Sequence, residues 1–291
     1  MTSGTLTISI PDVLGRHVDD VEQLHVAVAA APDAAEYAFD LGAVDFIRPH
    51  GAMALVVAAR QVAARTGRRV TLRNLAQQIH LYLERMDLFM VGEEWLRVEA
   101  PPVGAWTRNP WTSNLLELMT IAGPRDVETA IIRAERIFAP CLTDADLAKL
   151  LNVLSEICAN VYQHSGDPQG GVMIQRYQIP TREEMVVCLA VSDLGLGVRG
   201  SLAGRHGNLG NTPLEYLRAA LQGRTSRVSG RGGLGLRHVA QIAGETGGYL
   251  HLRSESAAVL TTSVGAGRIA TRLTALPGTH VVVEIRTSAR P

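Results

Sequence analysis

Apolar residues recur along the first third of the chain with two alternating periods. Stretches that alternate apolar and polar residues are typical of strands, and apolar residues spaced three or four apart are typical of amphipathic helices. The spacing predicts strands over residues 5–10, 35–44 and 68–75, and helices over residues 21–30, 52–67 and 76–89. Strands that alternate with helices predict a mostly parallel or mixed sheet with helices packed on it.

The second half of the chain has helices grouped ahead of most of its strands. The pattern predicts a strand over residues 115–122, helices over residues 126–139 and 143–164, strands over residues 171–179 and 184–193, a helix over residues 236–248, and strands over residues 249–255 and 279–285. This order favours a layered α/β sandwich over a doubly wound fold. Residues 198–233, rich in glycine, arginine and serine, are predicted to form a long loop.

A stretch rich in proline and turn-forming residues, residues 100–114, separates the two patterns. Such a composition is typical of segments between domains. We therefore expect an N-terminal α/β domain over residues 1–98, a linker over residues 99–113 and a C-terminal α/β domain over residues 114–291.

The composition is that of a globular protein without a general affinity for polyanions. Of the 291 residues, 46% are apolar, and 28 basic side chains balance 28 acidic ones. A zero net charge argues against a general nucleic-acid or membrane-surface binder, which needs a basic excess. The N-terminus does not resemble a signal peptide, and the best apolar run, residues 51–59, is too short to span a bilayer.

Cysteine usage gives an expectation about the compartment. Cys141, Cys158 and Cys188 are odd in number, scattered, and set among apolar neighbours, without the paired spacing of a metal site. Buried reduced thiols are typical of proteins in a reducing compartment. We therefore expect a cytoplasmic protein.

One predicted helix carries a row of polar residues beside its apolar stripe. In SEICANVYQHS, residues 155–165, the side chains of Glu156, Asn160 and His164 are spaced four apart. In an α-helix this spacing stacks them in one row. Taken alone, such a row is most simply a solvated flank. It would be the wall of a site if other segments supplied complementary groups.

Three later stretches have the composition of a nucleotide-binding site. They are VSDLGLGV (residues 191–198), SGRGGLGLRHV (residues 229–239) and PGTHVVVEI (residues 277–285). Glycines before a helix let backbone N–H groups face an anion such as phosphate. An aspartate at the end of a strand, here Asp193, can accept a hydrogen bond from an amino group in a partly dry pocket. Each stretch alone is a weak signal, because glycine-rich turns are common.

In this order the four stretches resemble the nucleotide-binding boxes of the GHKL ATPase superfamily, which includes DNA gyrase, heat-shock chaperones, mismatch-repair ATPases, histidine kinases and anti-sigma-factor kinases. The resemblance covers about residues 114–287. It implies a Bergerat fold, in which helices lie on one face of a mixed sheet and ATP is held with Mg²⁺ under a mobile lid.

The resemblance also implies a role for each matching residue. Asn160 would coordinate Mg²⁺, and Glu156 would act as general base on a water or an acceptor hydroxyl. Asp193 would bind the adenine amino group with support from Thr279, and His164 would contact phosphate or simply end the helix. The residues that would shape the pocket and cradle the phosphates are Gly195, Gly197, Gly232, Gly233, Leu234 and Gly235.

The segment expected to form the lid, between Val198 and Gly232, is basic. From Leu196 to Arg237 there are seven arginines and one acidic residue, Glu215. Arginine forms charge-assisted hydrogen bonds with phosphate, so this excess suits a triphosphate. A solvated basic loop is the alternative.

The residues of the first motif, residues 155–165, indicate a branch of the superfamily. SEICANVYQHS is similar to the glutamate-containing box of anti-sigma-factor kinases, whereas typical histidine kinases have asparagine at the position of Glu156. No phospho-acceptor helix of the dimerising histidine-kinase type precedes it. Histidine-kinase function is therefore not expected.

The N-terminal part is similar to a STAS domain, the anti-anti-sigma fold, over about residues 5–92. The similarity is carried by AFDLGAVDFIRPHGAMALVVAARQ, RRVTLRNL and LYLERMDLF. In partner-switching STAS proteins a serine precedes the glycine that opens the central helix, and here His50 stands at that position. This departs from the usual serine switch. We expect His50 to be a helix cap or a surface residue, with Pro49 just outside the helix.

Together, the two resemblances imply an Mg²⁺-dependent ATPase or serine kinase-like switch that acts through protein partners, with the STAS-like domain regulating in cis. One alternative is a non-catalytic, nucleotide-gated interaction protein; another is that the glycine stretches are only turns. By analogy, the partner would be a sigma factor or a STAS protein, and the chain would form a homodimer. Direct binding to nucleic acid or to a membrane is not expected.

Overall fold

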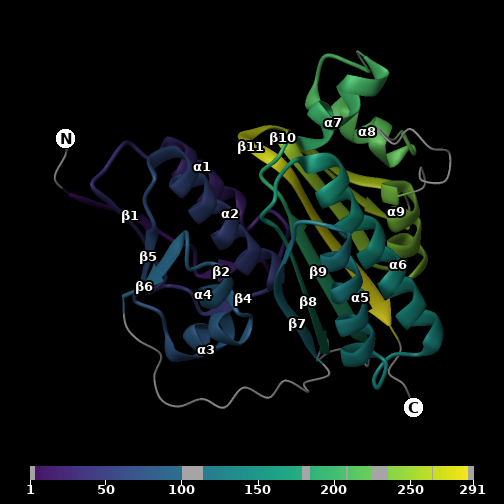
Figure 1. Cartoon of the computed structure of the whole chain (residues 1–291), viewed down its shortest axis with the longest axis horizontal. Coiled ribbons are helices and arrows are strands. Elements are labelled where there is room, and N and C mark those ends of the chain that lie inside the picture. Colours follow the sequence, from purple (N-terminus) through teal and green to yellow (C-terminus); the bar gives the residue numbers. More distant parts are fainter. Residues whose placement is uncertain are drawn as a thin grey trace. The chain divides into compact units, whose positions relative to one another are not determined.

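The computed structural model describes residues 4–99, 114–178, 184–207, 209–224, 235–263 and 265–287. The chain divides into two compact units, Met1–Pro110 and Trp111–Pro291. Both are drawn in Figure 1, and each is considered by itself. Nearly all of the segment expected to be the linker, residues 100–113, lies outside the described residues.

The first unit is an α/β structure built on a parallel sheet. Its elements are β1 (Thr5–Ser9), β2 (Val13–Leu14), α1 (Glu22–Ala30), β3 (Glu36–Asp40), β4 (Phe46–Ile47), α2 (Pro49–Thr66), β5 (Val70–Arg73), α3 (Gln77–Arg85), α4 (Leu88–Val91) and β6 (Leu96–Val98). The sheet has the order β1-β3-β5-β6, and every pairing in it is parallel. The described strands thus form no mixed sheet here. The apolar run of Tyr37, Ala38 and Phe39 is fully buried in β3, as expected for a parallel strand.

Helix boundaries in the first unit correct two sequence expectations. Pro49 is the first residue of α2 rather than a residue outside it, and the helix ends at Gly67 with φ 69°. Proline is well suited to a first helical position, since its missing N–H is not needed there. The single helix predicted over residues 76–89 is two helices, because Asp87 between them has a left-handed backbone with φ 56°.

The second unit is an antiparallel sheet with helices on one face. Its elements are β7 (Leu115–Ile121), α5 (Pro124–Phe138), α6 (Asp144–Asn160), the π-helical turn η1 (Val161–Ser165), β8 (Gly170–Gln178), β9 (Met185–Ser192), α7 (Gly197–His206), α8 (Pro213–Leu221), α9 (Gly235–Glu245), β10 (Tyr249–Thr262) and β11 (Gly265–Thr287). The strand order is β10-β11-β9-β8-β7, and all pairings are antiparallel rather than mixed. Figure 1 shows α5, α6 and α9 lying across one face.

In the core of the second unit, apolar residues of α6 pack with alternate residues of the sheet. Leu150, Leu154 and Ile157 are buried on α6, as the apolar stripe predicted, and they belong to one cluster with Val187 and Leu189 of β9. Burying each such side chain contributes about 1.5–3 kcal/mol relative to leaving it exposed. This packing orients α6, so its polar row is presented beside the core.

The strands β10 and β11 form a hairpin that is longer than predicted and bent. Register shifts flank Glu255, whose φ is 50°. The buried guanidinium of Arg253 donates hydrogen bonds to the carbonyl oxygens of Glu255 and Thr274 at this bend. The distal half of the hairpin, beyond the bend, contributes Ala257 and Val259 to the core.

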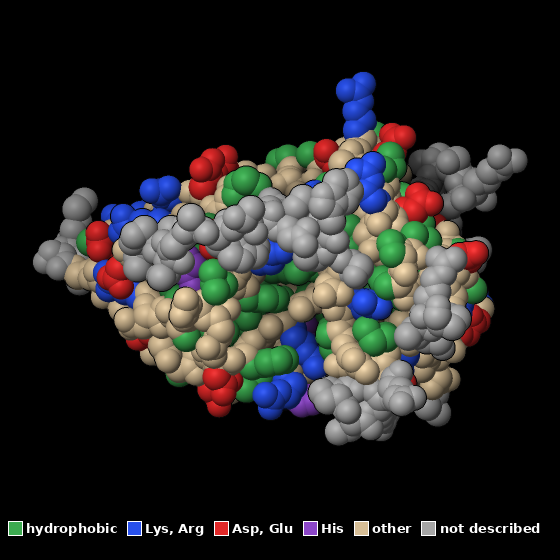
Figure 2. All heavy atoms as spheres, turned by 90° about the horizontal axis from the view of Figure 1, so that it is seen from below, with side chains coloured by type: hydrophobic (Ala, Val, Ile, Leu, Met, Phe, Trp, Pro, Cys, Tyr) green, Lys and Arg blue, Asp and Glu red, His purple; other side chains and the backbone are tan. Residues whose placement is uncertain are grey.

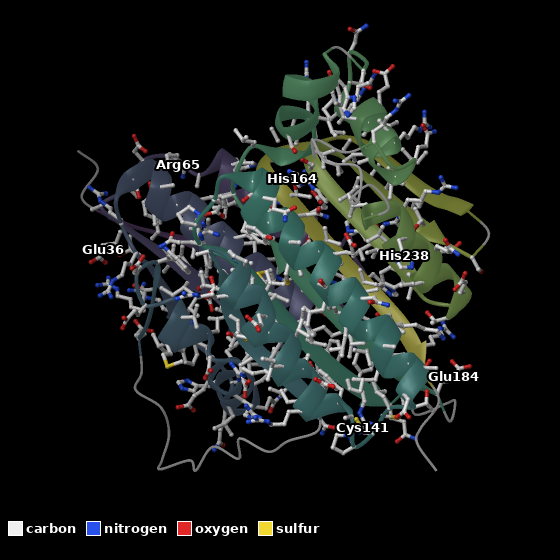
Figure 3. The ribbon with its side chains drawn as sticks, turned by 45° about the vertical axis from the view of Figure 1, so that its right-hand side comes forward. Glu36, Arg65, Cys141, His164, Glu184 and His238 are labelled. Atoms are coloured by element: carbon white, nitrogen blue, oxygen red, sulfur yellow. The ribbon has the colours of Figure 1, made fainter. Side chains whose placement is uncertain are left out.

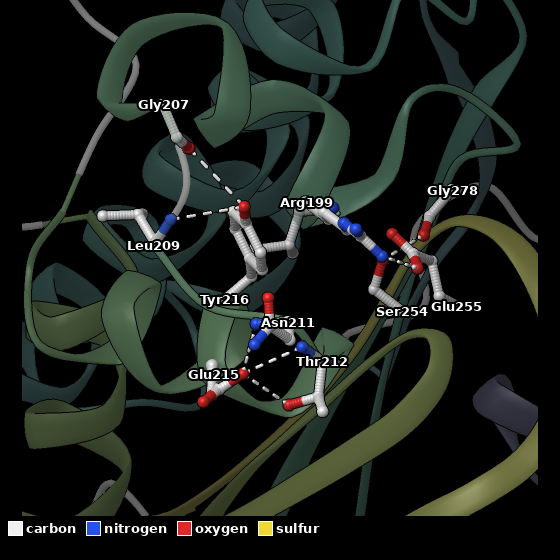
Figure 4. Close-up of polar contacts among 11 residues, drawn as sticks. Arg199, Gly207, Leu209, Asn211, Thr212, Glu215, Tyr216, Ser254, Glu255 and Gly278 are labelled. Atoms are coloured by element: carbon white, nitrogen blue, oxygen red, sulfur yellow. Dashed lines mark hydrogen bonds and ion pairs between the residues drawn. The ribbon is translucent and has the colours of Figure 1, made fainter.

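Much of the segment predicted to be a long loop is helical, since α7 and α8 occupy it. The start of α8 is a capping box, in which the Glu215 carboxylate accepts hydrogen bonds from the N–H groups of Asn211, at 2.7 Å, and Thr212, at 2.8 Å (Figure 4). These hydrogen bonds lower the pKa of Glu215. The sequence did not predict α7 and α8, because glycine and arginine are frequent in this segment.

None of the helices in the described part of the chain is long and apolar enough to cross a membrane. Cys158 and Cys188 are buried, Cys141 is partly exposed, and none of the three forms a disulfide. Burial raises the pKa of the Cys158 thiol. Basic and acidic side chains both occur across the face shown in Figure 2, as expected for a chain of zero net charge.

Candidate functional site

One cavity in the second unit gathers residues from all four polar stretches. It has a volume of about 90 Å³ and lies where the end of α6 meets the first residues of α7 and α9 and the strands β9 and β11. The predicted site residues that line it are Asn160, His164, Asp193, Gly197, Gly235 and Thr279. Typical small-molecule sites measure about 300–1,000 Å³, so only part of a nucleotide would fit inside the cavity as it stands.

The polar row on α6 does not continue as a straight α-helical row. The α-helix ends at Asn160, and Val161–Ser165 form a π-helical turn that carries His164. Figure 3 labels His164 at this end of the helix. π-Helical turns are rare and occur frequently at functional sites. Here the turn brings both Asn160 and His164 to the cavity wall.

Glu156 faces the first residue of α9. A Cβ built on Gly235 would lie 3.2 Å from Glu156 Oε2 and 3.9 Å from Asn160 Oδ1. Glu156 Oε2 is buried and has no hydrogen-bond partner among the described residues. A buried carboxylate oxygen without a partner loses its hydration without compensation, a penalty of about 1–3 kcal/mol. Such an arrangement is typical of a group that has a partner only when a ligand or a reacting proton is present.

Asp193 is held in place by the chain around it. Its side chain is 3% exposed, and its Oδ1 accepts a hydrogen bond from the Gly195 N–H at 2.9 Å. Its own N–H donates to the Thr279 carbonyl at 3.0 Å, which joins the ends of β9 and β11. The two residues that the sequence assigned to one subsite are therefore neighbours on the cavity wall.

Two glycines allow this close packing. Gly278 has φ 80°, and a Cβ on it would lie 1.9 Å from the Asp193 carbonyl oxygen. A Cβ on Gly197, which has φ 67°, would lie 2.7 Å from Ser254 Oγ. Larger residues at either position would push apart β9, β11 and the start of α7.

The start of α7 is tied to the bend in the hairpin. Ser254 Oγ donates to the Gly278 carbonyl at 2.7 Å and accepts from the Val198 N–H at 3.1 Å. At the next residue, the guanidinium of Arg199 lies 4.0 Å from the Glu255 carboxylate and over the Tyr216 ring, 5.6 Å from its centroid (Figure 4). The helices α7 and α8 are thus linked to the cavity wall by polar contacts.

Gly195 has a structural rather than a lining role. It is not on the cavity wall, and a Cβ on it would lie 1.9 Å from the Ser165 carbonyl oxygen. The glycine is needed because the chain after β9 passes directly over the π-helical turn. The remaining predicted cradle residues, Gly232, Gly233 and Leu234, lie outside the described residues.

Sequence reasoning missed several residues of this site. Ser201 of α7 and Arg224, just beyond α8, line the cavity. Asp167 is buried, and its Oδ2 accepts a hydrogen bond from the Leu194 N–H at 2.7 Å, which fixes the loop after Asp193. Arg224 belonged to the recognised arginine excess. No sequence signal pointed to Ser201. None pointed to Asp167 or Ser254 either, because each forms a hydrogen bond with a residue distant in the sequence.

The site supplies few protein ligands for a metal. Among the described residues, no group of three or more His, Cys, Asp or Glu side chains is placed to hold a metal ion. Magnesium bound to nucleotides keeps several waters and needs only one or two protein oxygens besides the phosphates. The amide oxygen of Asn160, close to Glu156, fits that requirement.

No protein-family model, no curated protein and no solved structure matches the chain. The site is therefore interpreted from its own residues and geometry.

Proposed function

We propose that the protein is an Mg²⁺-dependent, ATP-binding ATPase or serine kinase-like regulatory switch of the GHKL type, with a Bergerat-type second unit, that acts through protein partners. The observation that carries the proposal is the cavity on which Asn160, Asp193, Gly235 and Thr279 converge from four separate segments. The convergence of polar groups and glycines from segments distant in the sequence supports a common ligand for them. The buried, unpartnered Glu156 Oε2 beside it adds a group suited to catalysis.

In this proposal the adenine end lies against Asp193 and Thr279. The Asp193 carboxylate accepts the Gly195 N–H through Oδ1, which fixes its orientation. Each carboxylate oxygen has two lone pairs, so the group can also accept from an amino group of a ligand. The walls beside it include Val191, Val281 and Leu236, which suit the faces of a purine ring. The phosphates would extend toward the first residue of α9 and toward Arg224.

Magnesium-bound ATP would supply the phosphoryl group, and the residues of the chain would position and activate the acceptor. Asn160 would bind through its amide oxygen on the metal side of the phosphates. Glu156 would take the proton from a water or an acceptor hydroxyl through Oε2. The start of α9 would direct backbone N–H groups toward the phosphates.

The first unit is proposed to be a STAS-like domain that regulates the second unit in cis. Its support is the order of parallel strands and the long central helix α2, which begins at Pro49 and carries His50. Deleting residues 1–100 tests this part. We expect a changed ATP turnover or partner binding, and unchanged values for both would refute regulation in cis.

Binding and turnover of ATP test the main proposal. Isothermal titration of the whole chain with ATP and Mg²⁺ should give saturable binding, and phosphate release should depend on Mg²⁺. Binding without turnover would favour the non-catalytic, nucleotide-gated interaction protein. An absence of both would refute a nucleotide site.

Asp193→Asn tests the adenine assignment with little change in shape. The Asn side chain keeps an Oδ1 that accepts the Gly195 N–H, so the loop is maintained. It replaces the second acceptor by an N–H donor that opposes the adenine amino group. ATP affinity should fall by about a hundredfold or more, which corresponds to about 3 kcal/mol. Preserved affinity would refute the assignment.

A further inference from the structure

A second concave site lies in the same unit and is lined by other residues of helices α8 and α9 than the cavity is. It is a groove of about 610 Å³ between α8, α9 and the distal half of the β10–β11 hairpin. None of its lining residues belongs to the cavity that contains Asp193. Its volume lies within the range of ligand sites, and its open form allows an extended segment to lie along it.

Each helix presents one continuous face to this groove. On α9 the groove residues are spaced three or four apart from Arg237 through Gln241 to Glu245, and Arg218 and Leu221 form the matching row on α8. Val239, Ile242 and Ala243 of α9 point to the core instead. The groove face is thus a separate side of the helix with its own composition.

The charges in the groove favour an acidic ligand. Two arginines and one glutamate line it, which gives an excess of one positive charge. The Arg218 and Arg237 side chains are exposed, and Arg218 also interacts electrostatically with Glu215, three residues earlier. Glu245 accepts a hydrogen bond from Gln241 Nε2 at 2.8 Å, so its carboxylate is already engaged within its own helix.

The remaining walls resemble a protein-binding surface more than a nucleic-acid one. Ile269 of the hairpin, which is 39% exposed, and the partly buried Leu221 of α8 both line the groove. Amide and hydroxyl groups lie between them, which can pair with the backbone of an extended peptide. A polyphosphate backbone would gain nothing from the apolar residues and would be opposed by Glu245.

We propose that this groove binds an acidic, extended peptide segment of a protein partner. Arg218 and Arg237 would hold its carboxylates with charge-assisted hydrogen bonds, and apolar side chains between the acids would contact Ile269 and Leu221. The groove would thereby give the protein a partner site distinct from its nucleotide site.

The groove and the cavity share two helices. Ala220 of α8 and Gly235 and Leu236 of α9 line the cavity, while Arg218 and Arg237 of the same helices line the groove. A ligand that shifts either helix changes both sites. If the proposed ATP site is correct, ATP and the peptide will therefore alter each other's affinity by the same factor.

The experiment uses the whole chain and a short fluorescein-labelled peptide of alternating glutamate and leucine, followed by anisotropy without nucleotide. Peptides with glutamine or lysine in place of glutamate are the controls. We expect saturable binding of the acidic peptide that weakens with salt, and weaker binding of both controls. Equal binding of the glutamine peptide, no binding at low salt, or tighter binding of a short RNA would overturn the proposal.

Substitutions test whether the peptide binds in the groove. The double variant Arg218→Glu with Arg237→Glu should weaken binding by about tenfold or more. The double variant Arg125→Glu with Arg136→Glu, at two exposed positions on α5, is the matched charge control and should change little. Glu245→Gln should tighten binding several-fold, a gain that misfolding cannot imitate. Unchanged affinity in the double variant, or weaker binding by Glu245→Gln, would refute the groove.

Repeating the titration with ATP and Mg²⁺ separates the two proposals. A changed peptide affinity supports the coupling. If the protein does not bind ATP, the proposed function fails, while the peptide result without nucleotide still decides whether the groove is a partner site.

Discussion

Each unit contains buried polar side-chain atoms without a hydrogen-bond partner, and two of these atoms have different surroundings. One is Nδ1 of His50, near the start of α2 in the first unit; the other is Oε2 of Glu156, near the end of α6 in the second. Backbone closes around His50: a Cβ on the neighbouring Gly51 would lie 2.2 Å from the Leu14 carbonyl oxygen. Glu156 instead lies beside Gly235 and Asn160, which line a cavity.

An unpartnered buried atom can have a ligand as its partner only where a ligand has room, and this holds for Glu156 but not for His50. His50 is 5% exposed, and its Nε2 lies 3.2 Å from the His17 carbonyl oxygen, so the ring is a structural part of its unit rather than a cap or surface residue. Because that oxygen can only accept, Nε2 carries the proton and Nδ1 is the bare nitrogen. The sequence expectation for His50 was therefore wrong.

The largest expected effect tests the functional side of this comparison. Glu156→Gln keeps the size of the side chain but removes its capacity to accept a proton. If Glu156 is the general base, Mg²⁺-dependent phosphate release should fall by about a hundredfold to ten-thousandfold. ATP affinity, measured by isothermal titration, and the thermal unfolding temperature should remain near wild type. Full turnover in this variant would remove Glu156 from the mechanism.

The next effect concerns folding of the first unit. Gly51→Ala places a methyl group against the Leu14 backbone, which is part of the short strand pair β2–β4 and cannot rotate away as a side chain can. We expect a loss of about 3 kcal/mol of stability, at the upper end of overpacking penalties. Urea unfolding of the whole chain should show one transition displaced to lower urea. Ala52→Gly, one position along, is a control for the helix itself.

The sequence predicted the helices and strands of both units well where a single face is buried. The stripe on α6, for example, was recognisable because its apolar residues pack on β9. The sequence did not predict the π-helical turn at Val161–Ser165 or the helix break at Asp87, since both depend on backbone geometry imposed by distant packing. The distal half of the β10–β11 hairpin was missed because its strands have mixed composition.

The candidate site was predictable only in part. The residues that share a recognisable local pattern, such as Asn160 and Asp193, do line one cavity. The residues that hold them, such as Asp167 and Ser254, contact partners 27 and 56 residues away in the sequence and carry no local signal. Gly195 was expected to shape the nucleotide pocket. In the structure a glycine is needed there because the Ser165 backbone lies against it.

A pH titration sharpens the structural side of the comparison. Burial lowers the pKa of His50 to about 4, with smaller opposing influences from the His17 carbonyl and Asp20 and a supporting one from Arg48. The neutral ring is therefore favoured in the native state, while the unfolded chain binds a proton below the ordinary histidine pKa of about 6.5. Stability is fully present above that pH and is lost as pH falls from about 6.5 to about 4.

At about pH 5 this contribution amounts to a loss of about 2 kcal/mol relative to pH 7. His50→Gln keeps an N–H donor toward the His17 carbonyl but does not titrate. In urea unfolding across this range, the variant should lack that part of the pH dependence. An identical slope in both proteins would show that His50 is not the titrating group.

The smallest expected effect comes from the same change, glycine to alanine, made beside Glu156 in the second unit. Gly235→Ala places a methyl group 3.2 Å from Glu156 Oε2, which is the end of a flexible side chain and not backbone. Because Gly235 begins α9 and alanine favours helix, stability should change by less than about 0.5 kcal/mol. The displaced carboxylate should reduce ATP turnover by about tenfold, a smaller loss than in Glu156→Gln, because the base remains but is misplaced. Thermal unfolding and phosphate release on the same preparation measure both quantities.

A large loss of stability with normal turnover per folded molecule would mean that Gly235 serves packing, as Gly51 does. The two buried polar atoms, His50 Nδ1 and Glu156 Oε2, would then not differ in kind.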